Sequence, residues 1–317
     1  MSSIVRQPVY YPVSTVFVDD SVDFLHAVRG LLPNSAMHRF YADPHEALAW
    51  VSLQAQRDGA LRSLSGRPWS EFEKRGGNAV GDDLMADAAR FEGIAALVVD
   101  YEMPGCDGIQ FLSAVPEMDC AKILLTGTAD ESRAVEAFNA GLIDFYLKKS
   151  DPAMTRKLSR VLAEARQKYF ARRGPIGVHG VGAIYTLPNT REELERIVVR
   201  ERIVEYYWRP EQNAVLTLDQ EGRAGVFVAW DAHDWAAQCD VVADENGPMP
   251  LRDALSARHA MPVFWPHEAY RAGQHGLKMM TPTPIPGIDD AYYGWTTLDA
   301  WVPDAGQMTY AGWRSAQ

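Results

Sequence analysis

Hydrophobic residues in the first half of the chain gather in short runs that show little alternation with polar positions. The clearest runs cover residues 15–18, 95–99, 121–126 and 144–147, and each ends at or beside an acidic, hydroxyl or basic side chain. Such runs are typical of strands that are buried on both faces of a parallel sheet. The pattern therefore predicts buried strands whose carboxyl ends carry polar groups.

Between these runs, apolar residues recur every three or four positions, which is the spacing of one helix face. The predicted helices begin after the first strand, with Phe24, Leu25 and Val28 on one face, and continue over Asp43–Gln54, Ile109–Val115 and Asp130–Ala140, the last ended by Gly141. Alternating strands and helices favour right-handed crossovers in an α/β fold. We predict a doubly wound parallel sheet of five strands within residues 1–150.

A longer helix is predicted over residues 151–173, because Asp151 stands at an N-cap position and Pro152 at the first helical position. Its apolar stripe continues past about Ala165, where a helix of this length outruns the sheet. We therefore expect its end to contact a second protomer or the second domain. The glycine-rich residues 174–182 that follow predict a linker.

The second half, residues 183–317, mixes strand and helix patterns. The stretch AVLTLDQEGRAGVFVAW predicts two strands joined by a glycine-containing turn, and PLRDALSARHA predicts a helix. Antiparallel strands mixed with helices are typical of an α+β domain. Seven of the nine tryptophans lie in this half, and we expect most of them in the core or at a domain interface.

Composition narrows the class of protein. No apolar run reaches the ~18 residues of a membrane span, and the first residues lack the pattern of a signal peptide, which favours a cytoplasmic protein. The net charge is −11, and residues 175–317 hold 11 Lys and Arg against 19 Asp and Glu, so we expect no nucleic-acid-binding surface. The three cysteines lack ligand spacing and support neither a disulfide framework nor a zinc site.

Polar side chains converge where the predicted parallel strands end. Counted in a sheet of five strands, the four runs are the first, third, fourth and fifth. Asp19 and Asp20 follow the first, Asp100 ends the third, Thr126 ends the fourth, and the lysines at 148–149 end the fifth. Ligands of open α/β sheets bind at this edge. Because Mg²⁺ takes one or two protein carboxylates and keeps several waters, the cluster predicts a magnesium site beside a lysine.

The same residues lie in four motifs, which are VDD at 18–20, DYEMPGCDG at 100–108, LTGTAD at 125–130 and DFYLKK at 144–149. As a set these motifs resemble the receiver domain of two-component response regulators, over roughly residues 13–150, which implies a flavodoxin-like fold. The resemblance implies that a sensor histidine kinase or a phosphotransfer protein phosphorylates Asp100. It also implies a homodimer whose formation depends on phosphorylation.

The resemblance further implies a role for each member of the polar cluster. Asp20 and Asp100 are expected to bind Mg²⁺ together with the backbone carbonyl of Glu102, and Asp19 is a second acid that acts directly or through water. Thr126 is expected to hydrogen-bond the phosphoryl group, and one lysine to pair with it.

Either Lys148 or Lys149 can be the active-site lysine, depending on the alignment. Aligning Phe145 with the family's aromatic residue makes Lys148 the active-site lysine, whereas aligning Tyr146 with it favours Lys149. We prefer Lys148, and the other lysine is then a solvated charge. In this family the aromatic residue moves with the strand-four hydroxyl on phosphorylation, so Phe145 is the first candidate for that switch and Tyr146 the second.

An insertion separates the second predicted helix from the third strand. It covers about residues 55–92, which is longer than most connections inside a compact domain. Leu84 and Met85 favour one short helix, and Trp69 and Phe72 another. We predict an extension on the second-helix side of the receiver domain.

The output domain, residues 183–317, is harder to assign. Segments such as FNAGLIDFYLKKSDP and PVFWPHEAYR resemble the response regulators of α-hydroxyketone quorum sensing. We expect a non-catalytic output domain that binds a partner or ligand; a phosphorylation-regulated enzyme, a nucleotide-binding output and a DNA-binding regulator remain alternatives. His233 and Asp234 resemble the metal-binding pair of HD phosphohydrolases but lack the further ligands, so we predict that they begin a helix.

Overall fold

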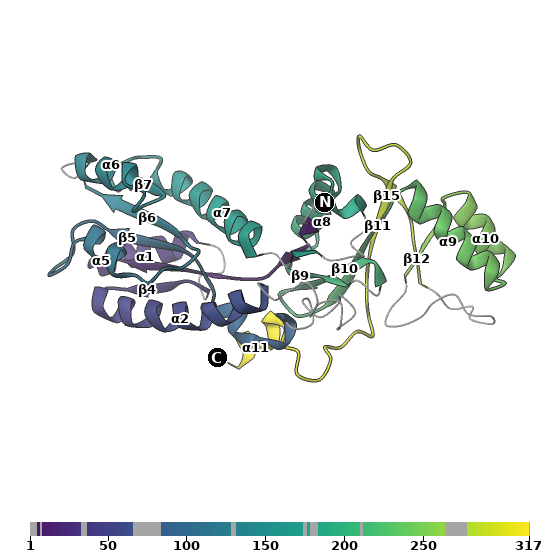
Figure 1. Ribbon diagram of the computed structural model, residues 1–317, viewed down its shortest axis with the longest axis horizontal. Coiled ribbons are helices and arrows are strands. Elements are labelled where there is room, and N and C mark those ends of the chain that lie inside the picture. Colours follow the sequence, from purple (N-terminus) through teal and green to yellow (C-terminus); the bar gives the residue numbers. More distant parts are fainter. Residues whose placement is uncertain are drawn as a thin grey trace. The chain divides into compact units, whose positions relative to one another are not determined.

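A computed structural model describes residues 5–6, 8–32, 37–65, 84–127, 131–173, 176–177, 183–209, 212–263 and 278–316. The chain divides into two compact units (Figure 1). The parallel unit contains the described residues of 12–65 and 89–173. The antiparallel unit contains the described residues of 5–11, 84–88 and 176–316.

The parallel unit is built on a five-stranded sheet in the order β4-β3-β5-β6-β7, with every neighbouring pair parallel. Its strands are β3 (Ser14–Val18), β4 (Arg39–Tyr41), β5 (Ile94–Asp100), β6 (Ala121–Thr126) and β7 (Phe145–Lys148). β5 lies in the middle and is buried along its whole length. The predicted doubly wound parallel sheet is confirmed.

Helices cover both faces of this sheet. One core contains side chains of α2 (Pro44–Ser65), α5 (Gly108–Ala114) and α6 (Glu131–Asn139), and the other contains side chains of α1 (Val22–Leu31) and α7 (Met154–Arg173). The helices agree with the predicted segments except that α2 is longer and α7 begins three residues after Asp151. Gly141 follows α6 with φ 70°, a conformation that glycine adopts without steric cost.

The end of α7 packs against its own sheet further than the sequence suggests. Tyr169 is buried, and a Cβ added to Gly93, which directly precedes β5, would lie 2.3 Å from the Tyr169 hydroxyl. The stripe that was expected to leave the sheet beyond Ala165 therefore continues on the parallel unit at least to Tyr169.

The antiparallel unit is built on a six-stranded sheet in the order β14-β15-β11-β10-β9-β2. Its strands are β2 (Val9–Tyr10), β9 (Ile203–Arg209), β10 (Ala214–Asp219), β11 (Ala224–Trp230), β14 (Thr283–Pro284) and β15 (Tyr292–Thr297). The predicted hairpin is β10 and β11, which pair with Val215 opposite Phe227. The expectation of an α+β second domain is confirmed.

Two cores lie on the two faces of this sheet. One contains residues of η3 (Ala183–Thr186) and α8 (Pro188–Arg200), and the other residues of α9 (Ala232–Asp244) and α10 (Met249–Ser256), together with β12 (Met261–Pro262) and β13 (Met279–Met280). A short α11 (Tyr310–Ser315) ends the described chain. Trp208, Trp230 and Trp235 are buried, and Trp295, Trp301 and Trp313 are partly buried.

The first described residues belong to the antiparallel unit, whereas the sequence analysis assigned residues 1–150 to the parallel sheet. β2 pairs with β9, the Tyr10 and Tyr206 rings stack with centroids 5.7 Å apart, and β1 (Val5–Arg6) pairs with β8 (Ile176–Gly177). The parallel unit is thus inserted between strands of the antiparallel unit. Of the predicted linker 174–182, the two described residues form β8.

The predicted insertion is also divided between elements. Residues up to Ser65 extend α2, and the predicted positions of Trp69 and Phe72 lie outside the described residues. Residues 84–86 are helical, as predicted, but they belong to the antiparallel unit, where Met85 is fully buried and its carbonyl accepts a hydrogen bond from the Met308 N–H at 2.8 Å. This described part is therefore not an extension of the parallel unit.

Within the described residues, no helix combines the length and the apolar character that crossing a membrane requires.

Candidate functional site

Three carboxylates meet at the carboxyl edge of the parallel sheet. Asp19 directly follows β3, Asp20 comes next, and Asp100 is the last residue of β5, the neighbour of β3. One ligand oxygen from each lies within 4.8 Å of the others. Asp19 and Asp100 are buried and Asp20 is exposed. Hard oxygen donors with one open, solvated side fit a divalent cation such as Mg²⁺, which retains waters.

Local backbone geometry fixes the Asp100 carboxylate. Its Oδ1 accepts a hydrogen bond from the Tyr101 N–H at 2.9 Å, and the Tyr101 carbonyl accepts one from the Gly108 N–H at 2.9 Å. A Cβ at Gly108 would lie 2.3 Å from the Asp100 carbonyl oxygen, so only glycine fits there. Asp107 caps α5 with its side chain. The turn after β5 therefore holds the acid in place.

Lys149 is the lysine of this site. Its Nζ lies 2.8 Å from Asp19 Oδ2 and 2.8 Å from Asp100 Oδ1, and its side chain is 26% exposed. Its backbone N–H donates to the Thr126 carbonyl at 3.0 Å, which joins the ends of β6 and β7. One ammonium group is thus shared by two buried carboxylates.

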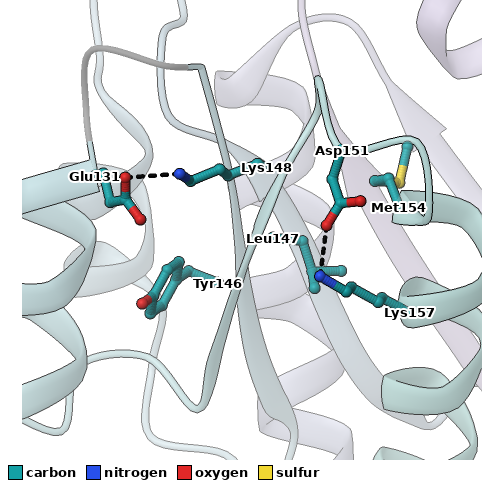
Figure 2. A pocket seen from close by; sticks show the side chains of 7 residues that line it. All are labelled: Glu131, Tyr146, Leu147, Lys148, Asp151, Met154 and Lys157. Atoms are coloured by element: carbon teal, nitrogen blue, oxygen red, sulfur yellow. Dashed lines mark hydrogen bonds and ion pairs between the residues drawn. The ribbon is translucent and has the colours of Figure 1, made fainter.

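The preference for Lys148 was wrong. Lys148 pairs with Glu131 of α6 at 2.7 Å, as Figure 2 shows. The two lysines point to opposite sides because successive residues at a strand end alternate between faces. Lys148 lines a cavity of about 300 Å³ with Tyr146, Asp151 and Lys157.

The two aromatic candidates also lie on opposite faces of the sheet. Phe145 packs with α1 and α7, and the Lys168 ammonium lies 5.1 Å from its ring centroid. Tyr146 packs with the other core, and its ring meets the Phe138 ring of α6 edge-on at 6.3 Å. With Lys149 as the site lysine, the alignment that favours it makes Tyr146, and not Phe145, the candidate switch residue.

Electrostatics of the cluster follow from burial and charge. Burial raises the pKa of the Asp100 carboxyl, the hydrogen bond with Lys149 opposes this, and the nearby Asp19 charge adds to it, with a net upward shift. Burial acts to lower the pKa of the Lys149 ammonium, but hydrogen bonds with Asp100 and Asp19 outweigh it and raise that pKa. The Lys149 ammonium therefore offsets the cost of burying the two carboxylates, and the carboxylates offset the cost of burying the ammonium.

Thr126 supplies a free hydroxyl at the same edge. It is the last residue of β6 and is fully buried, and its Oγ1 has no hydrogen-bond partner among the described residues. Buried polar atoms without partners are uncommon in folded proteins. The hydroxyl is available to a ligand, as its predicted role requires. The predicted role of the Glu102 carbonyl stays a prediction, and its side chain is exposed.

One neighbour of the site was not predicted. The Phe24 ring of α1 lies under the Lys149 ammonium, with the centroid 4.8 Å from Nζ. Its only signal in the sequence was its position four residues, or about one helical turn, after Asp20. The sequence pattern assigned Phe24 to the helix face that packs on the sheet, and the ring does pack there in part.

Elsewhere, His233 and Asp234 lie in the first turn of α9. Asp231 caps this helix and accepts hydrogen bonds from the N–H groups of both residues at 2.9 Å, so their predicted place at a helix start is confirmed. Over the described ranges, Asp19, Asp20 and Asp100 form the one group of three or more residues whose geometry suits a metal ion.

Comparisons with known proteins agree with this site. The model of the response regulator receiver domain matches residues 79–159, which include Asp100, Thr126 and Lys149. The cyclic di-GMP phosphodiesterase response regulator RpfG of Xanthomonas campestris is 36% identical over 76 residues, 23% of this chain and 20% of RpfG. The phosphoglycerate transport system transcriptional regulatory protein PgtA of Salmonella typhimurium is 25% identical over 201 residues, 61% of this chain and 39% of PgtA. The chain thus spans well under half of either curated relative.

A solved structure extends the likeness to both units. The response regulator LqsR of Legionella pneumophila superposes with a TM-score of 0.73 at 24% identity, covering 98% of this chain and 95% of LqsR. At this identity the likeness concerns the fold. The parallel unit is a response regulator receiver domain. The chain therefore joins a receiver domain to an antiparallel second domain, and both share the fold of LqsR.

Proposed function

We propose that Asp100 accepts a phosphoryl group from a sensor histidine kinase or a phosphotransfer protein, with Mg²⁺ held by Asp19, Asp20, Asp100 and the Glu102 carbonyl. The observation that carries this proposal is the Lys149 ammonium, which lies 2.8 Å from both Asp19 and Asp100. A second support is the buried Thr126 hydroxyl, which has no partner among the described residues. Together they offer a nucleophile, a positive charge and a hydrogen-bond donor at one edge.

The chemistry follows from these groups. One oxygen of Asp100 forms a bond to phosphorus while the bond from phosphorus to the donor imidazole nitrogen breaks, and the imidazole keeps the electron pair. Bound Mg²⁺ would supply charge neutralisation for the phosphoryl oxygens. Lys149 moves its ammonium from Asp100 to a phosphoryl oxygen while it stays near Asp19. Thr126 donates its hydroxyl proton in a hydrogen bond to another phosphoryl oxygen.

Phosphorylation then controls homodimerisation and the output of the antiparallel unit. Tyr146 is the proposed carrier of the change, because it lies on the neighbouring strand and contacts Phe138 of α6. We propose that the output binds a partner or ligand and is not catalytic. Its 11 Lys and Arg against 19 Asp and Glu over residues 175–317 disfavour DNA. The resemblance to α-hydroxyketone regulators and the LqsR-like fold support a role in quorum sensing.

The test is incubation with acetyl phosphate and Mg²⁺, followed by intact mass and light scattering. We expect a phosphoryl mass increment on the wild-type chain, none on Asp100→Asn, and a rise in molecular mass upon phosphorylation. Removal of Mg²⁺ with EDTA should abolish the increment. An increment that persists on Asp100→Asn would place the phosphoryl group elsewhere, and an unchanged molecular mass would remove dimerisation from the proposal.

The adjacent lysines give a matched pair of variants. Lys149→Ala should slow phosphorylation by roughly 10²-fold or more, since it removes the charge that meets the phosphoryl oxygens. Lys148→Ala should leave the rate within about twofold, because its partner is the exposed Glu131. The opposite result would show that Lys148 is the site lysine.

A further inference from the structure

Phe24 lies beside the acidic cluster in a position that the motifs leave unassigned. Its ring centroid is 4.8 Å from Lys149 Nζ. The ring is half-buried and packs against the core under α1 and α7. The Lys149 ammonium is therefore surrounded by two carboxylates and one aromatic ring.

A closed series of contacts sets the position of this ring. Asp19 Oδ1 accepts a hydrogen bond from the Ser21 N–H at 3.0 Å, and Ser21 Oγ accepts one from the Phe24 N–H at 3.3 Å. The Phe24 ring then meets Lys149, whose ammonium returns to Asp19 Oδ2 at 2.8 Å. The acid, the helix cap, the ring and the lysine thus hold one another.

The contact between Lys149 and Phe24 is less exposed to water than a second lysine–phenylalanine contact in the same unit. Lys168 also lies over a phenylalanine, Phe145, at 5.1 Å, but its side chain is 49% exposed. The Lys149 side chain is 26% exposed and has two ionic partners, Asp19 and Asp100. The face of an aromatic ring attracts a cation more strongly where water is excluded.

We propose that Phe24 is a positioning residue for phosphoryl transfer, acting through Lys149. When an Asp100 oxygen bonds to phosphorus and the bond to the leaving group breaks, the Lys149 ammonium must leave Asp100 for a phosphoryl oxygen. The ring keeps the ammonium at the sheet edge during this exchange and keeps it from swinging into solvent. This inference rests on the proposed function.

The test compares full-length wild type with Phe24→Leu, Phe24→Tyr and, as a control, Val22→Ala. Val22 lies on the same helix and is 51% exposed. Phosphorylation by acetyl phosphate is followed against both donor and Mg²⁺ concentration. Phe24→Leu should lower the maximal rate by about 2- to 5-fold, with the half-saturating concentrations of donor and Mg²⁺ unchanged. Phe24→Tyr, which keeps the ring, should restore the wild-type rate, and Val22→Ala should match it.

Each other outcome has a definite meaning. A Phe24→Leu variant as fast as wild type, or a Phe24→Tyr variant as slow as Phe24→Leu, would overturn the positioning role. A raised half-saturating Mg²⁺ concentration at an unchanged maximal rate would show that the side chain only supports the acidic pair, and would also overturn it. If the wild-type chain takes up no phosphoryl group from acetyl phosphate or a kinase, the proposed function itself fails, and the role of Phe24 with it.

Discussion

Each of the two units buries a carboxylate, but the two carboxylates differ in their partners. In the antiparallel unit Glu205 is fully buried in β9, and its two oxygens accept hydrogen bonds from the Tyr207 hydroxyl at 2.7 Å and the Tyr310 N–H at 2.8 Å. In the parallel unit Asp100 is 5% exposed and shares one ammonium with Asp19. A buried charge is costly unless its partners satisfy it. Glu205 therefore joins β9 to α11, whereas Asp100 is held ready for a ligand.

Two buried threonines repeat this contrast. Thr217 of β10 accepts a hydrogen bond from the Trp295 indole N–H at 3.1 Å, which ties β10 to a side chain of β15. Thr126 of β6 ends a strand at the acidic cluster, and its hydroxyl has no partner among the described residues. The Thr217 hydroxyl therefore serves the fold, whereas the Thr126 hydroxyl is open to a ligand at the acidic cluster. Three predictions test this contrast, in order of decreasing effect.

The largest effect concerns the segment that starts the antiparallel unit. Tyr11 is 4% exposed, and its ring stacks on the Tyr207 ring with centroids 6.5 Å apart. Tyr11→Ala should destabilise the antiparallel unit by about 3–5 kcal/mol, the usual loss for a large buried aromatic side chain. Seven of the nine tryptophans lie between residues 208 and 313, so urea unfolding followed by tryptophan fluorescence reports on this unit.

Phosphorylation of Asp100 serves as the internal control for that variant. The increment from acetyl phosphate should persist in Tyr11→Ala under native conditions, because Tyr11 belongs to the other unit. Leu31→Ala, at a residue 56% exposed on α1, should leave the tryptophan transition unchanged. An unchanged transition in Tyr11→Ala would mean that the first strands are not part of the antiparallel unit.

The second effect concerns the satisfied carboxylate. Glu205→Ala leaves the Tyr207 hydroxyl and the Tyr310 N–H without their acceptor and should cost about 2–4 kcal/mol in the same unfolding experiment. Glu192→Ala is the matched control, since its carboxylate is 64% exposed in an ion pair with Arg196 and should change stability by less than about 0.5 kcal/mol. Equal effects of the two variants would remove the structural role of Glu205.

The sequence predicted the parallel unit well because its signals are local. A buried apolar run followed by an acid fixes where a strand ends, and parallel strands bring such ends to one edge, so Asp19, Asp20, Asp100 and Thr126 were found. The choice between Lys148 and Lys149 failed because it depends on which face each side chain takes at the end of β7. A shift of one residue reverses the faces, and the composition of FYLKK does not decide it.

The antiparallel unit was predicted less completely because its contacts are distant along the chain. Val9 of β2 pairs with Tyr207, and Met85 contacts Met308. A two-residue strand has too short a pattern to indicate its partner. The Phe24 contact was missed for a related reason, since helical spacing shows that a ring faces the sheet but not that a lysine from the fifth strand lies above it.

The smallest effect has the opposite sign and tests the carboxylate of Asp100. In EDTA, Asp100→Asn should stabilise the parallel unit by roughly 1 kcal/mol, because one carboxylate fewer shares the Lys149 ammonium and the burial of a charge is relieved. The raised pKa of Asp100 indicates the same direction, since the folded state favours its neutral form. Hydrogen exchange at the amides of β5 measures the change in this unit alone.

At saturating Mg²⁺ the wild-type chain should instead be more stable than Asp100→Asn. The cation stabilises the wild type, and the variant binds it more weakly. A variant less stable than wild type in EDTA would show that the ion pair with Lys149 outweighs the cost of burying Asp100. Asp100 would then resemble Glu205, a charge that serves the fold, and the contrast between the two units would rest on Thr126 alone. A reversal of sign between EDTA and Mg²⁺ is the expected result if burial and the neighbouring Asp19 charge make the Asp100 carboxylate costly until a cation binds.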